Sequence, residues 1–279
     1  MGALIAAMPR IPLEDNFDDV IRKAQRHAGL TDSALAEKAQ LTMAQVQALK
    51  TGTFDEKAVR AIAPVLKLGA NALVDLGRKA WYPEQPLFSR GFAIFNTNFE
   101  DMAVNSYLIW DPRTKRAVAF DTGGTVSPML DTIAAENLKL DSIFLTHTHD
   151  DHIADLDTLV KATHAPVFAS ELETIPSAKT FKEGATFHVD GLTIKTLSTW
   201  GHSPGGTSYV IGGLPQPLAI VGDSLFASSM GGGMVSPTEA YRNNVEKILT
   251  LSNGTVLASG HGPLTTVGQE KKHNPFFTR

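Results

Sequence analysis

The chain has 279 residues, 43% of them hydrophobic, and a net charge of -4, which is the profile of an ordinary folded protein with a sizeable core. It contains no cysteine, so disulfides, thiolate-ligated zinc, iron–sulfur clusters and a thiol nucleophile are excluded. No long run of one charge indicates a surface for polyanions. The start, MGALIAAMPR, has a short apolar run without a basic stretch before it, so we expect neither a secretion signal nor a membrane span, and a cytoplasmic location.

Residues 14–80 have the pattern of short helices separated by turns, with nothing typical of a strand. Thr31 and Thr42 are good N-caps for helices that run to Ala39 and Lys50. Further helices are predicted over Asn16–His27, Phe54–Leu68 and Ala70–Lys79. The apolar positions expected to form their core are Val20, Ile21, Leu35, Val46, Leu49, Ile62, Val65, Leu66 and Leu73. We therefore predict a small all-α domain over residues 1–80 and a proline-punctuated linker over 81–90.

Residues 91–279 alternate short apolar runs with helical segments, which predicts an α/β domain built in layers. The expected strands are 106–110, 117–120, 142–146, 166–170, 192–197, 208–211, 218–222 and 255–259. The expected helices between them are Met129–Asn137, Asp155–Thr163 and Pro237–Leu251.

Five of these strands end in a histidine or aspartate within a polar or glycine-rich turn. The densest of these turns is FLTHTHDDHI, residues 144–153, with three histidines and two aspartates in six consecutive positions. Imidazole nitrogens and carboxylate oxygens are the ligands that zinc, iron and manganese accept. One such strand end is usually surface decoration, but five of the same chemistry indicate a shared metal-binding cleft. The candidate residues are Asp121, His147, His149, Asp151, His152, His202, Asp223 and His261.

This pattern resembles the metallo-β-lactamase fold superfamily over about residues 90–275. The H-x-H-x-D-H signature matches His147, His149, Asp151 and His152, and later ligand positions match His202, Asp223 and His261. The resemblance implies an αββα sandwich with two divalent metal ions at one edge, zinc first and iron or manganese as alternatives. It implies one metal held by His147, His149 and His202, a second held by Asp151, His152 and His261, and Asp223 as the bridge. Asp121 is then expected to orient a ligand imidazole.

In such a site a metal-bridging hydroxide attacks a carbonyl that the metals polarise. Asp151 and Asp223 are the carboxylates predicted to act in catalysis. No Ser–His–Asp triad is needed, so we interpret Ser203 and Ser224 as turn residues. We assign no role in the site to the remaining histidines: a surface position is predicted for His27, His164 and His188, and for His273 a substrate contact is the less favoured interpretation.

The segments GHSPGG, GDSLFASS and GHGPLTTVGQEKKHNPFF resemble the short glyoxalase II-like hydrolases. That resemblance implies hydrolysis of a small-molecule thioester of the hydroxyacylglutathione type. A lactonase or other esterase of the same fold, and a persulfide dioxygenase with one iron, are the alternatives. Trp200, Phe226 and Met230 are candidate substrate contacts, although core packing explains each equally well.

Residues 16–77 resemble the helix-turn-helix domain of Cro/repressor-like regulators. The recognition helix, Thr42–Lys50, would present Met43, Gln45, Gln47 and Lys50 to a major groove. Residues 1–80 hold 11 Lys+Arg against 9 Asp+Glu, which is little positive charge for phosphate contacts. A helical module that dimerises or walls the active site is therefore favoured over a DNA-binding regulator with the metal domain as its sensor. We expect a homodimer in either case.

Overall fold

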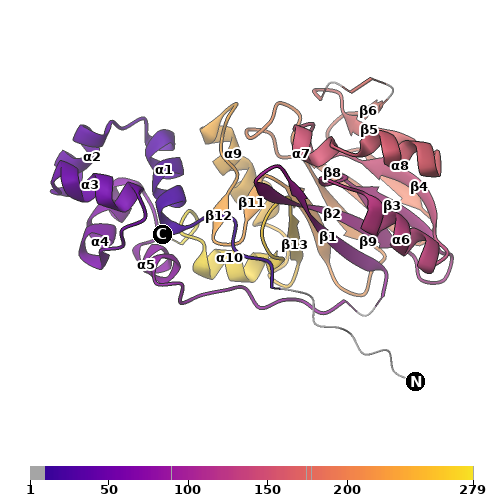
Figure 1. The fold of residues 1–279 in the computed structure, drawn as a ribbon, viewed down its shortest axis with the longest axis horizontal. Coiled ribbons are helices and arrows are strands. Elements are labelled where there is room, and N and C mark those ends of the chain that lie inside the picture. Colours follow the sequence, from indigo (N-terminus) through magenta and orange to yellow (C-terminus); the bar gives the residue numbers. More distant parts are fainter. Residues whose placement is uncertain (1–9, 89, 174, 177, 279) are drawn as a thin grey trace.

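A computed structural model describes residues 10–88, 90–173, 175–176 and 178–278 of the protein. Five short helices come first, and two β-sheets with their covering helices follow (Figure 1). The five helices, residues 17–77, are called the helical region below; they lie at one end of the molecule, beside the last residues of the chain (Figure 1).

The helical region confirms the expected helices and most of their core. Thr31 Oγ1 accepts a hydrogen bond from the N–H of Ala34 at 3.2 Å, and Thr42 Oγ1 accepts one from the N–H of Gln45 at 3.2 Å. The predicted core residues are buried, except Val65, which is half-buried at the edge of the apolar cluster. The helices are α1 (Phe17–Ala28), α2 (Asp32–Ala39), α3 (Met43–Lys50), α4 (Glu56–Val65) and α5 (Ala70–Gly77).

Two six-stranded sheets form the rest of the molecule. The first has the order β1 (Phe92–Phe99), β2 (Met102–Trp110), β3 (Arg116–Phe120), β4 (Lys139–Phe144), β5 (Val167–Ser170) and β6 (Lys179–Phe181). The second has the order β14 (Thr265–Thr266), β13 (Val256–Ser259), β10 (Leu218–Gly222), β9 (Thr207–Gly212), β8 (Leu192–Ser198) and β7 (Thr186–Val189). A short hairpin, β11 (Leu225–Phe226) and β12 (Ser229–Met230), stands apart.

Three apolar layers hold the sheets and helices together. One cluster fills the space between the sheets, with Tyr107, Phe120 and Tyr209 among its fully buried side chains. A second packs the outer face of the first sheet against α6 (Ser127–Ala135) and α8 (Leu156–Thr163). A third packs the second sheet against α10 (Val267–His273) and a π-helical turn, Asn244–Ile248, that continues α9 (Pro237–Asn243). The αββα sandwich is therefore confirmed.

The expected strands are present, but several elements escaped the pattern. Strand β1 was not predicted because its second half alternates exposed polar residues: Asn96 and Asn98 are exposed where the β1–β2 hairpin extends past the core. The β11–β12 hairpin and β14 are two residues per strand, too short for a periodic signal. The single helix expected over 237–251 is instead α9 followed by the π-helical turn.

The helical region shares its core with the sandwich. Its apolar cluster includes Met230 of β12, Ala240 of α9 and Phe276 of the tail. The N–H of Gly69 donates to the carbonyl of Pro275 at 2.7 Å. Among the described residues, no helix is both long and apolar enough to cross a membrane.

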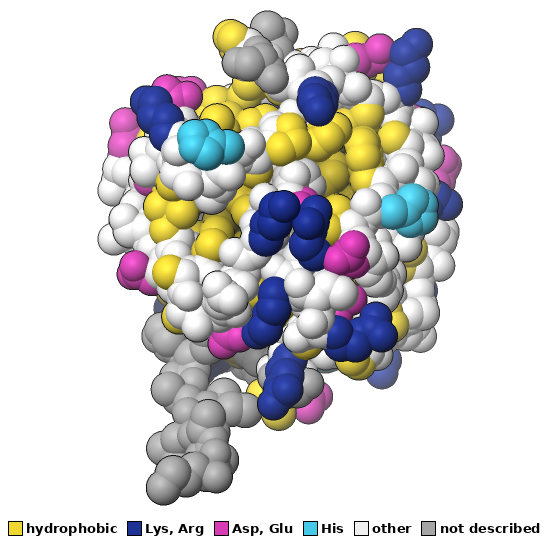
Figure 2. Space-filling model, turned by 90° about the vertical axis from the view of Figure 1, so that its right-hand side faces the viewer, with side chains coloured by type: hydrophobic (Ala, Val, Ile, Leu, Met, Phe, Trp, Pro, Cys, Tyr) yellow, Lys and Arg dark blue, Asp and Glu magenta, His cyan; other side chains and the backbone are white. Residues whose placement is uncertain are grey.

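The end of the sandwich that lies away from the helical region exposes apolar side chains bordered by lysines and arginines (Figure 2). A groove of about 330 Å³ at the sheet ends is lined by Phe168 and Phe187, which pack against the core between the sheets. The inner layer therefore reaches the surface there.

Candidate metal centre

One edge of the sandwich collects the predicted strand ends. Strands β3 and β4 run parallel in one sheet, and β10 and β13 run parallel in the other, so their carboxyl ends meet at this edge. His147 and His149 follow β4, while Asp151 and His152 lie in the single turn of α7 (Asp150–Ile153). His202 follows β8, Asp223 follows β10 and His261 follows β13.

Three imidazoles form the first group of converging nitrogens. His149 Nδ1 lies 3.0 Å from His147 Nε2 and 3.0 Å from His202 Nε2. The nitrogens of a tetrahedral zinc site lie about 3.3 Å apart, so these distances fit one small cation. Burial is the main reason that the pKa of His147 is far below its usual value, and a neutral imidazole is the form that a metal requires.

A second group lies beside the first. His261 Nε2 is 3.2 Å from Asp151 Oδ2, and His152 Nε2 is 3.4 Å from the same oxygen. Burial opposes protonation of these histidines, but the charge of Asp223 raises the pKa of His152 to about 10 and that of His261 to about 11. The carboxylates here therefore attract positive charge, which a bound cation would supply.

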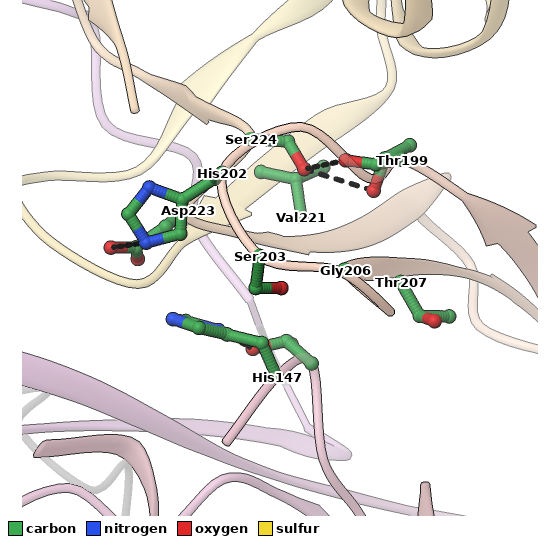
Figure 3. Close-up of a pocket in the computed structure, with 10 residues that line it drawn as sticks. His147, Thr199, His202, Ser203, Gly206, Thr207, Val221, Asp223 and Ser224 are labelled. Atoms are coloured by element: carbon green, nitrogen blue, oxygen red, sulfur yellow. Dashed lines mark hydrogen bonds and ion pairs between the residues drawn. The ribbon is translucent and has the colours of Figure 1, made fainter. Parts of the chain in front are cut away.

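Asp223 lies between the two groups. Its Oδ1 is 3.2 Å from His152 Nε2, and its Oδ2 is 3.4 Å from His202 Nε2 (Figure 3). Burial disfavours the ionised carboxyl, but His261 and His152 hold the pKa of Asp223 well below its usual range. Asp223 Oδ1 and His152 Nε2 are buried without a hydrogen-bond partner among the described residues. Unpartnered buried polar atoms indicate an external group such as a metal ion, and the residues present fit two of them.

Hydrogen bonds from the outer ring nitrogens fix three of the imidazoles. His152 Nδ1 contacts Asp121 Oδ2 at 2.8 Å, His202 Nδ1 contacts the Gly232 carbonyl at 2.8 Å, and His261 Nδ1 contacts the Ala103 carbonyl at 2.7 Å. With Nδ1 donating, each Nε2 turns its lone pair toward the centre. Asp121 lies where the resemblance implied.

Asp121 is itself held by Thr146, the second residue after β4. Its carboxylate accepts hydrogen bonds from the N–H of Thr146 at 2.8 Å and from Thr146 Oγ1 at 2.7 Å. Because Thr146 Oγ1 also lies 3.0 Å from His147 Nδ1, this carboxylate supports both groups of ligands.

Glu173 is a residue that the sequence reasoning missed. Its buried carboxylate accepts a hydrogen bond from the hydroxyl of Thr148, between His147 and His149, and one from the N–H of Gly205 at 2.8 Å. It thereby joins the two loops that carry the three-histidine group. No motif marks this glutamate, because both contacts depend on loop packing.

The two serines beside the ligands make no catalytic pair with a histidine among the described residues. Ser224 Oγ donates to Thr199 Oγ1 at 2.9 Å, as the dashed lines in Figure 3 show. Ser203 Oγ is buried without a partner and lines a small cavity with room for about one water molecule.

The three candidate substrate contacts have different surroundings. Phe226 packs its ring edge-on against His261, with centroids 5.7 Å apart. Trp200 is half-buried, and its carbonyl accepts a hydrogen bond from Asn243 at 2.8 Å. Met230 is instead fully buried in the core of the helical region, since β12 carries it away from the surface.

The C-terminal tail holds the β11–β12 hairpin in place. Asn274 Nδ2 donates to the carbonyl of Ser229 at 2.7 Å and to Glu270 Oε2 at 2.8 Å. Glu270 Oε2 also accepts from the N–H of Ser228 at 3.1 Å. The tail motif that suggested a glyoxalase II-like enzyme is therefore a structural support for the hairpin that carries Phe226.

The segment just before the helical region, together with α1, reaches the cluster, which no sequence signal indicated. Glu14 borders Gly262, so that a Cβ on this glycine would lie 3.2 Å from the Glu14 nitrogen. Lys23 of α1 pairs with Asp15, donates to the Met230 carbonyl at 2.9 Å and lies 5.1 Å from the Phe226 ring centre.

The candidate DNA-contacting residues of α3 are mostly engaged within the protein. Gln45 Oε1 accepts a hydrogen bond from the N–H of Thr42 at 2.9 Å. Gln47 and Lys50 both donate to Asp32. Met43 is exposed.

The remaining histidines are separate from the cluster. His164 and His188 are exposed as expected. The predicted surface position of His27 is wrong, because this side chain is half-buried and its ring centre lies 5.9 Å from that of Phe276. His273 stacks on Trp81 with ring centres 4.7 Å apart.

Known proteins are similar to this chain in sequence. A probable metallo-hydrolase of Streptococcus pyogenes is 30% identical over 200 residues, covering 61% of this chain and 84% of the relative. The hydroxyacylglutathione hydrolase GloC of Haemophilus influenzae is 29% identical over 203 residues, covering 62% of this chain and 92% of the relative.

Two solved structures resemble the sandwich. The BLEG-1 B3 metallo-beta-lactamase matches with a TM-score of 0.61 and 30% identity, over 67% of this chain and all of that one (100%). ETHE1 from Myxococcus xanthus matches with a TM-score of 0.59 and 27% identity, over 66% of this chain and 83% of that one. The family model described as the metallo-beta-lactamase superfamily matches residues 100–261, more than half of the chain. The chain belongs to the metallo-beta-lactamase superfamily.

Proposed function

We propose that the protein is a dinuclear metallohydrolase that cleaves thioesters of the hydroxyacylglutathione type. The observation that carries the proposal is the position of Asp223, whose two oxygens face His152 and His202 of different ligand groups. In this proposal one cation would be held by His147, His149 and His202 and the other by Asp151, His152 and His261, with Asp223 positioned between the two groups.

Two divalent cations at these positions supply Lewis acidity toward a carbonyl oxygen and bring the pKa of water near neutrality. The chain itself holds the imidazoles in one tautomer through Asp121 and the carbonyls of Gly232 and Ala103. Phe226 beside His261 limits the access of water on one side. The carboxylates of Asp151 and Asp223 stay ionised, since neighbouring histidines outweigh burial and lower the pKa of both.

Two arguments favour a thioesterase with two metals over the other reactions of this fold. A relative named hydroxyacylglutathione hydrolase aligns over 92% of its own length. A dioxygenase with one iron would use a single group of ligands, whereas both groups are complete in this chain. We propose zinc as the metal, with iron or manganese as the alternative. Iron is supported by a neighbour with 27% identity and a TM-score of 0.54 that was crystallised in a di-iron form.

The test is elemental analysis of the purified protein together with hydrolysis of S-lactoylglutathione, in the wild type, His149→Ala and His188→Ala. His188 is an exposed histidine of β7, so His188→Ala is the matched control. We expect about two metals per chain and turnover in the wild type and in the control. The His149→Ala variant should lose both one metal and its activity. Two metals without turnover would reject S-lactoylglutathione as the substrate and direct the assay to other thioesters, to lactones and to a chromogenic cephalosporin. One iron or no metal would reject the dinuclear site.

For the N-terminal part we propose a helix-turn-helix-like domain over 1–80, joined by residues 81–90 to a hydrolase domain over 91–279. In this proposal the N-terminal domain forms one wall of the active site. The contacts of Lys23 with Met230 and Phe226, and the shared apolar core, support a wall that is fixed in place. DNA binding by α3 is the alternative, and the pairing of Gln47 and Lys50 with Asp32 argues against it.

A further inference from the structure

Several exposed apolar side chains lie on segments that are bonded to the loops of the cluster. Seven large ones are exposed in the part of the chain that the structure describes: Met43, Leu87, Met102, Leu172, Met234, Val235 and Val245. Four of the seven lie on three segments that bond to the metal-binding loops. Isolated apolar side chains on a surface need no explanation, but a gathering of them around one site indicates what binds there.

The first segment is the tip of the β1–β2 hairpin. Met102 opens β2 and is 45% exposed. The next residue, Ala103, accepts the hydrogen bond of His261 Nδ1 at 2.7 Å through its carbonyl. An exposed methionine is therefore the direct neighbour in sequence of a residue that contacts the second ligand group.

The second segment follows β5. Leu172 is 61% exposed and directly precedes Glu173. Glu173 binds Thr148 and Gly205, which lie on the two loops of the three-histidine group.

The third segment follows the glycines after β12. Met234 and Val235 are 68% and 50% exposed. The carbonyl of Gly232 accepts from His202 Nδ1 at 2.8 Å, and the N–H of Val235 donates to the carbonyl of Gly201 at 3.0 Å.

We infer that these three segments form an apolar rim around the metal centre, and that the substrate carries an apolar acyl chain next to the scissile carbonyl. Each segment lies within one to three residues of an atom bonded to a ligand or a ligand loop, which keeps each within about 10 Å of it. The segments come from different elements, β2, the loop after β5 and the loop before α9, so a shared position in sequence does not explain their agreement. The inference rests on the proposed thioester hydrolase and specifies the preferred acyl group of its substrate, a chain of medium length that ends in apolar carbons.

The test is kcat/KM of the metal-loaded protein for S-acetyl-, S-butyryl- and S-octanoyl-N-acetylcysteamine, kept below micelle-forming concentrations. We expect at least about a tenfold rise from acetyl to octanoyl, because each buried methylene contributes up to about fourfold. The variants Met102→Ser, Leu172→Ser and Met234→Ser should each lower the octanoyl-to-acetyl ratio. Leu87→Ser and Val245→Ser remove exposed apolar side chains outside the three segments and should leave that ratio unchanged.

The outcomes separate the two proposals. No hydrolysis of any ester by protein that holds its metals would reject the proposed function. Hydrolysis with no preference for chain length, or with a preference that all three rim variants keep, would overturn the apolar rim alone. Binding to phosphatidylcholine vesicles that the rim variants abolish, without a chain-length preference, would assign the rim to a lipid surface and also overturn the inference. The chain-length series on the wild type decides the question even if a variant fails to fold.

Discussion

The carboxylates of the metal-binding edge and of the helical region differ in their hydrogen-bond partners. At the edge, Asp223 Oδ1 and His152 Nε2 are buried with no hydrogen-bond partner in the described chain. In the helical region, Asp32 accepts hydrogen bonds from Gln25, Gln47 and Lys50. A polar group left unsatisfied inside a protein is costly, so the first arrangement calls for an external partner and the second does not. The difference holds for Asp223 and Asp32; His27 Nε2 of α1 is also buried without a hydrogen-bond partner in the described chain.

The largest expected effect comes from removing the residue that faces both ligand groups. Asp223→Ala should reduce the metal content from about two ions per chain to less than one and lower kcat/KM by more than about 100-fold, since even residues that only orient ligands contribute 10–100-fold. Elemental analysis and a thioester assay measure both effects. Asp157→Ala, at an exposed aspartate of α8, is the control. Full metal content in Asp223→Ala would show that the comparison misidentifies the site.

A buried carboxyl that has partners inside the chain should behave differently from Asp223. Burial raises the pKa of Glu270 from 4.5 to about 7, against hydrogen bonds from Thr265, Asn274 and Ser228. The folded state therefore binds the proton more tightly than the unfolded chain. The stabilisation that comes from protonated Glu270 is fully present below about pH 4.5 and is lost as the pH rises through 7. The free energy of unfolding falls by about 3 kcal/mol over this range.

Glu270→Gln should remove this loss, so that the variant gains stability relative to the wild type between pH 5 and pH 8. Urea unfolding at both values measures the difference, and the metal content should stay the same in both proteins. Parallel pH profiles for the two proteins would show that Glu270 is ionised throughout.

The positioning role of Glu173 predicts a smaller effect that is specific to one group of ligands. Glu173→Gln keeps one acceptor oxygen but loses the other, so either Thr148 or Gly205 loses its bond. The affinity of the three-histidine group for metal should fall by about 10–100-fold, with the second group less affected. Titration against a chelator measures the two steps separately.

Glu171→Gln is the control for this measurement, because Glu171 is an exposed glutamate two residues away. Combining Glu173→Gln with Thr148→Val should cost less than the sum of the single changes if the two side chains act through one hydrogen bond. Equal weakening of both metal sites would show that Glu173 supports the edge only in general.

The clustering of the candidate ligands was predictable because each follows a strand, and strands that end at one edge bring distant residues such as His147 and His261 together. The groups that hold these side chains in place were not predictable from the sequence. Gly232 and Ala103 act through their carbonyls, which every residue has, and Glu173 and Lys23 act through loop and helix packing that no short-range pattern encodes.

The fold follows the same division. A buried strand such as β10 is a continuous run of apolar residues, which predicts a strand. In β1 this apolar pattern stops where the strand extends past the core. The five helices were predictable from caps and apolar spacing, but their contact with the β11–β12 hairpin depends on side chains far apart in sequence, such as Lys23 and Phe226.

The smallest effect should come from the polar network of the helical region. Lys50→Ala removes an ion pair to Asp32 whose partners are 22% and 23% exposed, so the free energy of unfolding should fall by less than about 1 kcal/mol. Hydrogen bonds from Gln25 and Lys50 lower the pKa of Asp32, so this contribution is present above its ordinary pKa and is lost in acid. Urea unfolding at pH 7 and pH 3 checks both statements, and the metal content should not change. A loss of metal in Lys50→Ala would instead mean that the two regions depend on each other through α1, because Arg22 of α1 donates to the Lys50 carbonyl while Lys23 contacts the Met230 carbonyl beside the ligand loop.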